Sequence, residues 1–187
     1  MPEQILPYRL VDNQVSTKNK ILLTNIQLLS KQSYRDVSLD QIAKICEIKK
    51  QSVLYHFKSK QAMVLETILL IKTYHERELQ HQDNLEDILN TLARLFFEEE
   101  TGQVICRLAA YAHKDDPILN EPVHSYFTMM ENILHKAIHK FDKSLNALTE
   151  AKLILAKFVG AITADGLHGN RHCSNAVLES IKKRIAK

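Results

Sequence analysis

Apolar residues recur every three or four positions along most of the chain, which is the period of an amphipathic helix. The first such stripe contains Leu22, Ile26 and Leu29, and Ser16 or Thr17 is placed to cap its helix. No segment has the alternating pattern of a half-buried strand, and four Gly and four Pro residues are too few for a turn-rich β protein. The pattern predicts an all-α protein with nine or so helices.

Two short helices and the start of a third are predicted in the stretch that begins at Ser38. Ser38 and Gln41 have the spacing of a capping box. Glu47 lies in the turn after the first helix, and the second helix has Val53 and Phe57 on its apolar face. Three helical segments so close together predict a helix-turn-helix.

The other face of the second short helix is polar and basic. Its residues are Lys49, Lys50, Gln51, Leu54 and Tyr55. A short helix with a buried back and long polar side chains at the N-terminal end of its front is typical of recognition helices in the major groove. The alternative is an αα corner without a role in DNA binding, but the front carries no acidic residue after Glu47.

Ser59 and Lys60 follow the second short helix. Ser59 is a candidate N-cap for the next helix, and Lys60 would lie in its first turn. A helix N-terminus with a lysine beside it favours a phosphate contact.

The stretch resembles the N-terminal motif of the TetR family of bacterial transcriptional regulators. The matching residues are Ser38, Ile42-Ala43, Ile48, Ser52-Val53, Tyr55-His56-Phe57 and Ser59-Lys60. The resemblance implies a three-helix DNA-binding domain followed by a larger helical domain for ligand binding and dimerisation. By position, it assigns DNA contacts to Lys49, Lys50, Gln51, Tyr55, His56 and Lys60. Three residues depart from the family pattern, namely Glu47 where the turn usually has Gly, Leu54 for a Tyr and Gln51 for a small residue.

We therefore expect a mobile arm over residues 1–15, a helix-turn-helix domain over 16–60, and a ligand-binding and dimerisation domain over 61–187. Within the last, a helix should begin at Asp83 or Asn84, and Gly102 should interrupt the chain. Asp115-Asp116-Pro117 and Asn120-Glu121-Pro122 are alternative starts of a later helix. Thr149 should cap the penultimate helix, a loop should cover 166–173, and Ser174 should cap the last helix.

The segment 154–162 is apolar nearly all round, which in a helix requires cover on every face. We expect this helix and the last one to pair with their copies in a homodimer. The predicted interface residues are Ile154, Phe158, Val159, Ile162, Leu178 and Ile181.

Several large side chains follow the helix-turn-helix at helical spacings. The candidate ligand-binding residues are His75, Phe96, Tyr111, Tyr126, Phe127, Met130 and Phe158. An apolar pocket with a few polar groups is the usual small-molecule site, although most of these residues individually fit plain core packing. It is the family resemblance that makes a pocket for an unknown effector an expectation here.

The distribution of charge and the cysteine content bear on the binding partner and on the cellular compartment. Residues 1–72 hold 11 Lys/Arg and 6 Asp/Glu, whereas residues 73–187 hold 14 and 16, which is consistent with a nucleic-acid-binding N-terminal part. Three distant cysteines without a CxxC motif, no signal peptide and no membrane-spanning run favour a cytoplasmic protein.

Catalytic and metal-binding motifs are missing from the sequence. It contains no GxSxG, GxGxxG or GxxxxGK[ST] motif, so we expect neither an enzyme nor a cofactor. His135 and His139 share a helix face but have no carboxylate at a diagnostic spacing, so no metal site is predicted.

Together the motifs predict a TetR-like homodimeric regulator, most simply a repressor that leaves a palindromic DNA operator when a small molecule binds. The alternative is a helical dimer that binds a small molecule or a partner protein and does not bind DNA. Glu47 and Leu54, the departures in the turn and the recognition helix, favour that alternative.

Overall fold

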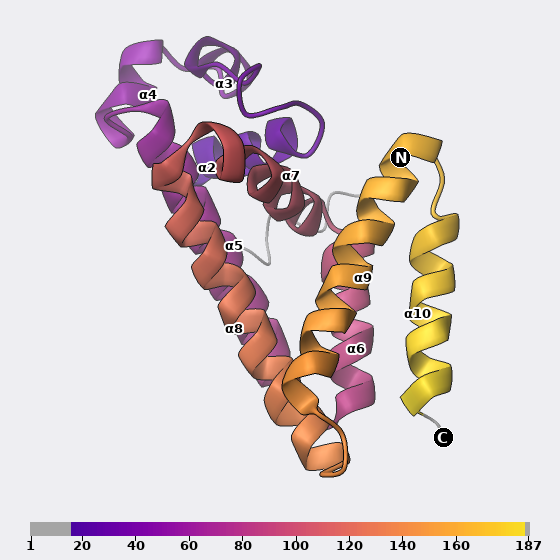
Figure 1. Cartoon of the computed structure of the whole chain (residues 1–187). Coiled ribbons are helices and arrows are strands. Elements are labelled where there is room, and N and C mark those ends of the chain that lie inside the picture. The colour runs from indigo at the N-terminus through magenta and orange to yellow at the C-terminus, as the bar shows by residue number, and fades with distance from the viewer. Residues whose placement is uncertain (1–15, 186–187) are drawn as a thin grey trace. The chain divides into compact units, whose positions relative to one another are not determined.

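The computed structural model describes residues 16–185, without the side chains of residues 113–115, 168 and 185. Every regular element in these residues is helical (Figure 1). The elements are α2 (Thr17–Leu29), α3 (Leu39–Ile45), α4 (Lys50–His56), α5 (Lys60–Gln80), α6 (Leu85–Ala93), the π-helix η1 (Arg94–Glu98), α7 (Glu100–Asp115), α8 (Pro117–Phe141), α9 (Ala147–His168) and α10 (His172–Ile185). The expected N-terminal arm, residues 1–15, lies outside the described residues. The all-α prediction is confirmed.

The described chain divides into two compact units. The first comprises the described residues up to Tyr74 together with Arg107–His124, and the second comprises His75–Cys106 and Ser125 onwards. Helices α5, α7 and α8 therefore each contribute to both units. None of the described helices is both long and apolar enough to cross a membrane.

The first unit is organised around α2. Ser16 caps this helix by accepting a hydrogen bond from the Asn19 backbone N–H at 3.2 Å. The apolar stripe of α2, with Ile21 and Ile26, is fully buried. On the same helix, the buried Asn25 amide donates to the Thr67 hydroxyl of α5 at 2.9 Å. Apolar burial and this polar link thus both hold α2.

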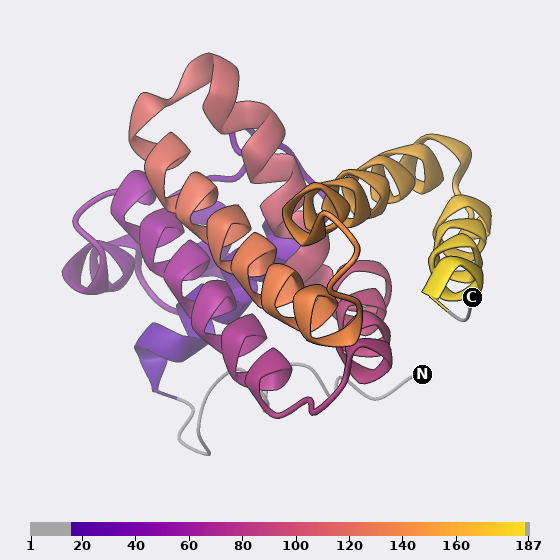
Figure 2. The same cartoon turned by 60° about the horizontal axis from the view of Figure 1, so that its bottom comes forward.

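The second unit contains α6, η1, α9 and α10. Asn84 caps α6 by accepting from the Asp87 backbone N–H at 2.9 Å, so the predicted start of this helix is confirmed. Figure 2 shows α9 and α10 as a pair of neighbouring helices joined by a short turn, as in Figure 1. Gly169 ends α9 at φ 67°, a left-handed conformation that suits glycine.

Gly102 does not interrupt the chain as predicted. It lies in the first turn of α7, directly after η1. A Cβ atom at this position would come within 2.5 Å of the Leu95 carbonyl oxygen and the Phe96 Cα. Glycine is therefore required here by a close backbone approach, not by a break in the helix.

The start of α8 decides between two predicted alternatives, and the start of α9 corrects a prediction. Pro117 occupies the first position of α8, so the earlier of the two proposed starts is confirmed. The cap of α9 is Asn146, which accepts from the Thr149 backbone N–H at 3.2 Å, so Thr149 itself is not the cap. The prediction was wrong because Asn146 forms the same kind of cap three residues earlier.

The start of α10 was also predicted too late. The helix begins at His172, and most of the expected loop 166–173 is helical. The His172 N–H donates to the Asn170 side-chain oxygen at 3.0 Å, and the next two N–H groups donate to the Asp165 carboxylate of α9, at 2.8 Å from the Cys173 nitrogen and 3.0 Å from the Ser174 nitrogen. The Ser174 hydroxyl also donates to Asp165. Ser174 is thus inside the helix, and the cap comes from Asn170 in the turn and from Asp165 on α9.

Candidate nucleic-acid interface

Helices α3 and α4 contain seven residues each, too few for a stable helix in water without support. The support at the start of α3 is a complete capping box. The Gln41 backbone N–H donates to the Ser38 hydroxyl at 3.1 Å, and the Ser38 N–H donates to the Gln41 side-chain oxygen at 2.8 Å. The capping box predicted from the sequence is therefore confirmed.

The turn between α3 and α4 depends on Glu47. Its φ is 57°, and it is the one non-glycine residue with positive φ among those the structure describes. The Glu47 N–H donates to the Lys44 carbonyl at 3.2 Å, and the Ile48 N–H donates to the Ala43 carbonyl at 3.0 Å. These two bonds form a Schellman motif, in which glycine is the usual left-handed residue. The turn keeps its geometry without the glycine, at a cost of about 1–2 kcal/mol.

The back of α4 is fixed by burial. Val53 and the C-capping residue Phe57 are inaccessible to solvent, and helices α2, α3 and α4 contact one another. Figure 1 shows the three helices gathered together. At the end of α3, the Lys20 ammonium group donates to the Cys46 carbonyl at 3.0 Å. The exposed face of α4 is therefore presented by a rigid support.

That exposed face carries the predicted DNA-binding residues. Lys49, Lys50 and Gln51 are exposed at the start of α4, and Tyr55 is 85% exposed. His56 is half-buried. Long hydrogen-bond donors and an aromatic ring thus occupy one continuous surface.

One acidic residue lies beside this surface. The Lys50 ammonium group forms an ion pair of 2.8 Å with Asp40, which lies in the first turn of α3. Both side chains are well exposed, so the pair contributes at most about 1 kcal/mol to stability. Lys50 can therefore exchange Asp40 for a phosphate or a base at little cost.

The short helices, their caps and their order along the chain match a known family. Residues 21–67 match the family model described as bacterial regulatory proteins, tetR family. This chain has the DNA-binding domain and the fold of a TetR-family transcriptional regulator. No curated protein matches the sequence.

Solved structures of TetR-family regulators have the same fold over nearly the whole chain. A TetR transcriptional regulator from Legionella pneumophila is 19% identical, with a TM-score of 0.82, and the match covers 92% of this chain and 98% of that one. A TetR-family regulator from Agrobacterium tumefaciens is 16% identical, with a TM-score of 0.81 and coverages of 90% and 96%. E. coli NemR in its reduced form is 19% identical, with a TM-score of 0.74 and coverages of 90% and 96%. At these identities the likeness concerns the fold.

Lys60 has a structural contact in this TetR-family domain that the sequence did not predict. Its ammonium group donates to the Tyr34 carbonyl and, at 3.4 Å, to the Arg35 carbonyl, and it lies 4.3 Å from the centre of the Tyr34 ring. Partial burial lowers the pKa of Lys60, while Asp36 opposes that change. Lys60 thus fixes the loop between α2 and α3, and its phosphate contact stays a prediction.

Tyr111 belongs to the first unit, whereas the other predicted ligand-binding residues belong to the second. Its ring is 4.5 Å from the ring of Tyr34, and the Arg35 guanidinium group lies 5.8 Å from its centre. In the same unit, the Gln61 amide donates to both carboxylate oxygens of Asp116, at 3.0 and 3.1 Å. Tyr111 therefore packs on the α2–α3 loop, a contact between residues 77 positions apart that no sequence pattern indicates.

The remaining predicted ligand-binding residues belong to the second unit. His75, Phe96, Tyr126, Met130 and Phe158 are all fully buried. The Phe96 and Phe158 rings meet edge to face at 5.8 Å, and Phe96 lies 6.5 Å from Tyr126. The structure therefore brings these aromatic side chains together in one cluster.

Phe127, the last residue of the predicted set, is half-buried at the side of this cluster. Its ring contacts Tyr126 edge to face, at 5.3 Å between the ring centres. Whether a ligand enters the aromatic cluster stays a prediction.

The polar groups of this cluster already have partners. The two ring nitrogens of His75 lie 2.7 Å from the Tyr126 hydroxyl and 2.9 Å from the Thr101 hydroxyl. The Thr101 hydroxyl in turn donates to Glu99, so it accepts from His75 Nε2–H, and Tyr126 donates to Nδ1. Burial, aided by the charge of Arg94, lowers the pKa of His75 to about 3. His75 is therefore neutral at physiological pH.

The predicted dimer residues differ in exposure. Ile154, Phe158 and Ile181 are buried among the residues of their own unit, whereas Val159 and Ile162 are half-buried, as is Leu178 on α10. Their part in an interface stays a prediction. The opposite face of α9, which the all-round apolar pattern concealed, exposes Leu153, Ala156, Gly160, Thr163 and Leu167.

Proposed function

We propose that the protein is a homodimeric, cytoplasmic transcriptional repressor that binds a palindromic DNA operator and leaves it when a small-molecule effector binds. The exposed face of α4, with Lys50, Gln51 and Tyr55 on a helix-turn-helix matched by the family model, is the observation that carries the proposal. No enzymatic activity and no cofactor form part of it.

The N-terminal end of α4 enters the major groove in this proposal. Gln51 suits adenine, because a side-chain amide can bind both N6 and N7, and Lys50 suits the O6 and N7 acceptors of guanine. Leu54, which is 39% exposed, offers an apolar contact for a thymine methyl group. Lys49, Tyr55 and His56 extend the contact surface, and Lys60 binds a backbone phosphate.

A second copy of the chain packs against the α9–α10 pair. The exposed face of α9 has small and apolar residues at helical spacing, and an isologous interface places each residue near the axis beside its own copy or a close neighbour. Two α4 helices in such a dimer contact half-sites about 34–36 Å apart, one turn of DNA. An effector that favours a different separation releases the operator.

A helical dimer without DNA binding is the second candidate, and Leu54 is the observation that favours it. The other departure, Glu47, lends it less support, because the turn keeps its Schellman hydrogen bonds despite the side chain. In this case the exposed face of α4 would contact a partner protein, or would have no partner.

Binding of the full chain to duplex DNA from beside its own gene distinguishes the two candidates. Fluorescence anisotropy should show saturable, salt-dependent binding by the wild type. Lys50→Ala should weaken it by about 10- to 100-fold, the usual effect of removing a good base contact. Lys152→Ala on α9 is the matched control, since it removes the same charge from an exposed position of the other unit. Equal effects of the two variants, or no binding by the wild type, would exclude this docking of α4.

A further inference from the structure

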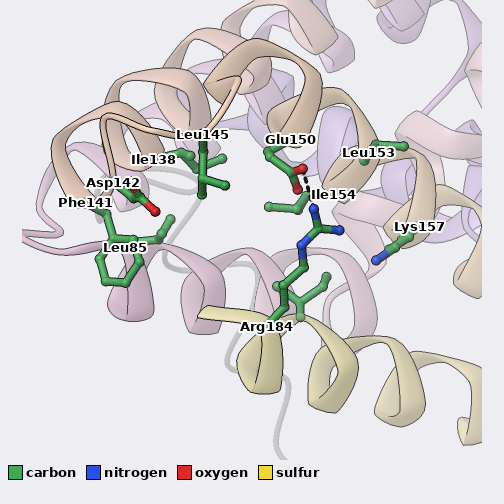
Figure 3. Close-up of a pocket in the computed structure, with 11 residues that line it drawn as sticks. Leu85, Ile138, Phe141, Asp142, Leu145, Glu150, Leu153, Ile154, Lys157 and Arg184 are labelled. Atoms are coloured by element: carbon green, nitrogen blue, oxygen red, sulfur yellow. Dashed lines mark hydrogen bonds and ion pairs between the residues drawn. The ribbon is translucent and has the colours of Figure 1, made fainter. Parts of the chain in front are cut away.

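A cavity of about 150 Å³ lies in the second unit, and no residue of the aromatic cluster lines it (Figure 3). Its walls come from α6, the end of α8, the loop that follows, the start of α9 and the end of α10. The apolar part includes Leu85, Ile138, Phe141, Ile154 and Ile181. The predicted ligand-binding residues do not line it, and no sequence pattern indicates it.

Three of the four charged residues that line the cavity have a charged or hydrogen-bonding partner, and Lys157 has no ion pair among the described residues. Arg184 of α10 forms an ion pair of 2.6 Å with Glu150 of α9, and Asp142 accepts hydrogen bonds from the Ser144 N–H and hydroxyl at 2.8 and 2.7 Å. Lys157 is half-buried, and no ion pair joins it to a carboxylate within the part of the chain that the structure describes. Figure 3 shows both Lys157 and Arg184 among the residues that line the cavity.

We propose that this cavity binds a small carboxylate whose apolar body is about the size of one six-membered ring. A cavity of 150 Å³ lined by Leu, Ile and Phe side chains is large enough for benzene. A carboxylate entering a largely apolar site needs a cation, which Lys157 supplies. Arg184 adds donors, because its guanidinium group has five N–H bonds and the ion pair with Glu150 leaves several for a ligand.

The aromatic cluster is the weaker candidate for the same ligand. The polar groups of His75, Tyr126 and Thr101 bind one another. Burial keeps the His75 ring neutral, because it lowers the pKa of that ring to about 3. A carboxylate there would lose its hydration without meeting a free cation. The cavity beside Lys157 avoids this penalty.

The ligand would be the effector of the proposed repressor, and only that role rests on the proposed function. It would bridge the end of α8 to α9 and α10, the helices assigned to the dimer. Binding itself can be measured on the full chain without DNA, so the site can be confirmed or excluded independently.

Isothermal titration calorimetry of the full chain with benzoate, cyclohexanecarboxylate and neutral benzamide tests the proposal. Both carboxylates should bind saturably, and benzamide should bind about tenfold more weakly because it lacks the charge-assisted hydrogen bond. Lys157→Met should weaken benzoate binding about tenfold and leave that of benzamide unchanged. Lys152→Met is the matched control on α9, outside the cavity, and should bind benzoate like the wild type.

A second variant fills the cavity without altering its charges. Leu145 lines the cavity from the loop before α9 and is 37% exposed, so Leu145→Trp can be accommodated and should abolish binding of both carboxylates. Circular dichroism verifies that each variant is folded. No binding by the wild type, equal binding of benzoate and benzamide, or equal effects of Lys157→Met and Lys152→Met would each overturn the proposal. Binding at Lys157 that leaves DNA affinity unchanged would support the site and exclude its role as the effector site.

Discussion

Helices α4 and α9 each bury one face, but the faces they expose differ in chemistry. The exposed face of α4 carries Lys50, Gln51 and Tyr55, whereas that of α9 carries Ala156 and Gly160 among leucines. Long polar side chains such as those on α4 can reach phosphates and base edges. Small apolar residues such as those on α9 allow another helix to approach closely, and their burial away from water lowers the free energy. From this difference we infer that α4 meets nucleic acid and α9 meets a second copy of the chain.

The two helices are also stabilised differently. α4 has seven residues and depends on the Schellman turn before it and on Val53 and Phe57 beneath it. α9 has 22 residues, and its buried face forms part of the core of the second unit. A change on the exposed face of either helix should therefore alter binding more than folding.

The largest expected effect is on the dimer. Gly160 and Gly166 both lie exposed on α9, and an added Cβ would meet no atom within 4 Å at either. Gly160→Arg should leave the subunit folded but dissociate the dimer, and DNA affinity should then fall by about 10²–10⁴ because the two half-sites are bound independently. Sedimentation velocity measures the dissociation of the dimer, and fluorescence anisotropy measures the loss of DNA affinity. Gly166→Arg, on a different side of the helix, should remain dimeric; a monomeric wild type at micromolar concentration would remove the basis of this assignment.

Lys60→Ala tests whether Lys60 contacts DNA together with the α4 surface. The variant should weaken DNA binding roughly tenfold. Loss of one phosphate contact per subunit should affect all DNA sequences about equally and lower the salt slope by about 1 per subunit. The variant also loses the hydrogen bond to the Tyr34 carbonyl, so its melting temperature should fall. A lower melting temperature with an unchanged salt slope would mean that Lys60 has only the structural role.

The α9–α10 pair should loosen in acid because Asp165 caps α10. Burial raises the pKa of this carboxyl, but hydrogen bonds from Ser174 and Cys173 outweigh that effect and hold the pKa below its ordinary value. The stabilisation is therefore complete above the unfolded pKa and is lost as the pH falls through the folded value. At neutral pH, Asp165→Ala should cost about 1 kcal/mol, as for loss of a helix cap. Hydrogen exchange should then increase at the start of α10 and not in α3 or α4.

The smallest effect is expected at Asp40, the acidic residue beside the α4 surface. Asp40→Asn removes a negative charge that pairs with Lys50. DNA affinity should rise two- to fivefold at low salt, since exposed pairs of this kind are worth up to about 1 kcal/mol, and the gain should shrink as salt is added. Asp87→Asn, an exposed change of the same charge in the second unit, is the control. A decrease in affinity would indicate that Asp40 orients Lys50 for its contact.

The helix-turn-helix was predictable because its determinants lie within a few residues of one another. The capping box needs only Ser38 and Gln41, and the buried back of α4 needs only Val53 and Phe57 at helical spacing. Even the positive φ of Glu47 agrees with the resemblance, because the turn of that family usually has Gly at this position. Local rules of this kind do not depend on the rest of the fold.

The second unit was less predictable because its determinants are distant in sequence. The apolar run in α9 does not indicate that Phe158 points inwards and Gly160 outwards, since both positions suit either side. The cavity requires α6, α8, α9 and α10 to converge, and Tyr111 finds its partner in a loop far from it in sequence. Side-chain periodicity predicts which elements form, but not which of them meet.

The close approach at Gly102 restricts what evolution or engineering can change in this protein. Even alanine would press its methyl group against the backbone of Leu95 and Phe96, and backbone atoms cannot rotate away as a side chain can. Gly160 and Gly166 have open space around them and accept larger residues as far as the single subunit is concerned. In a library of random variants selected only for a folded subunit, residue 102 should remain glycine while residues 160 and 166 diversify.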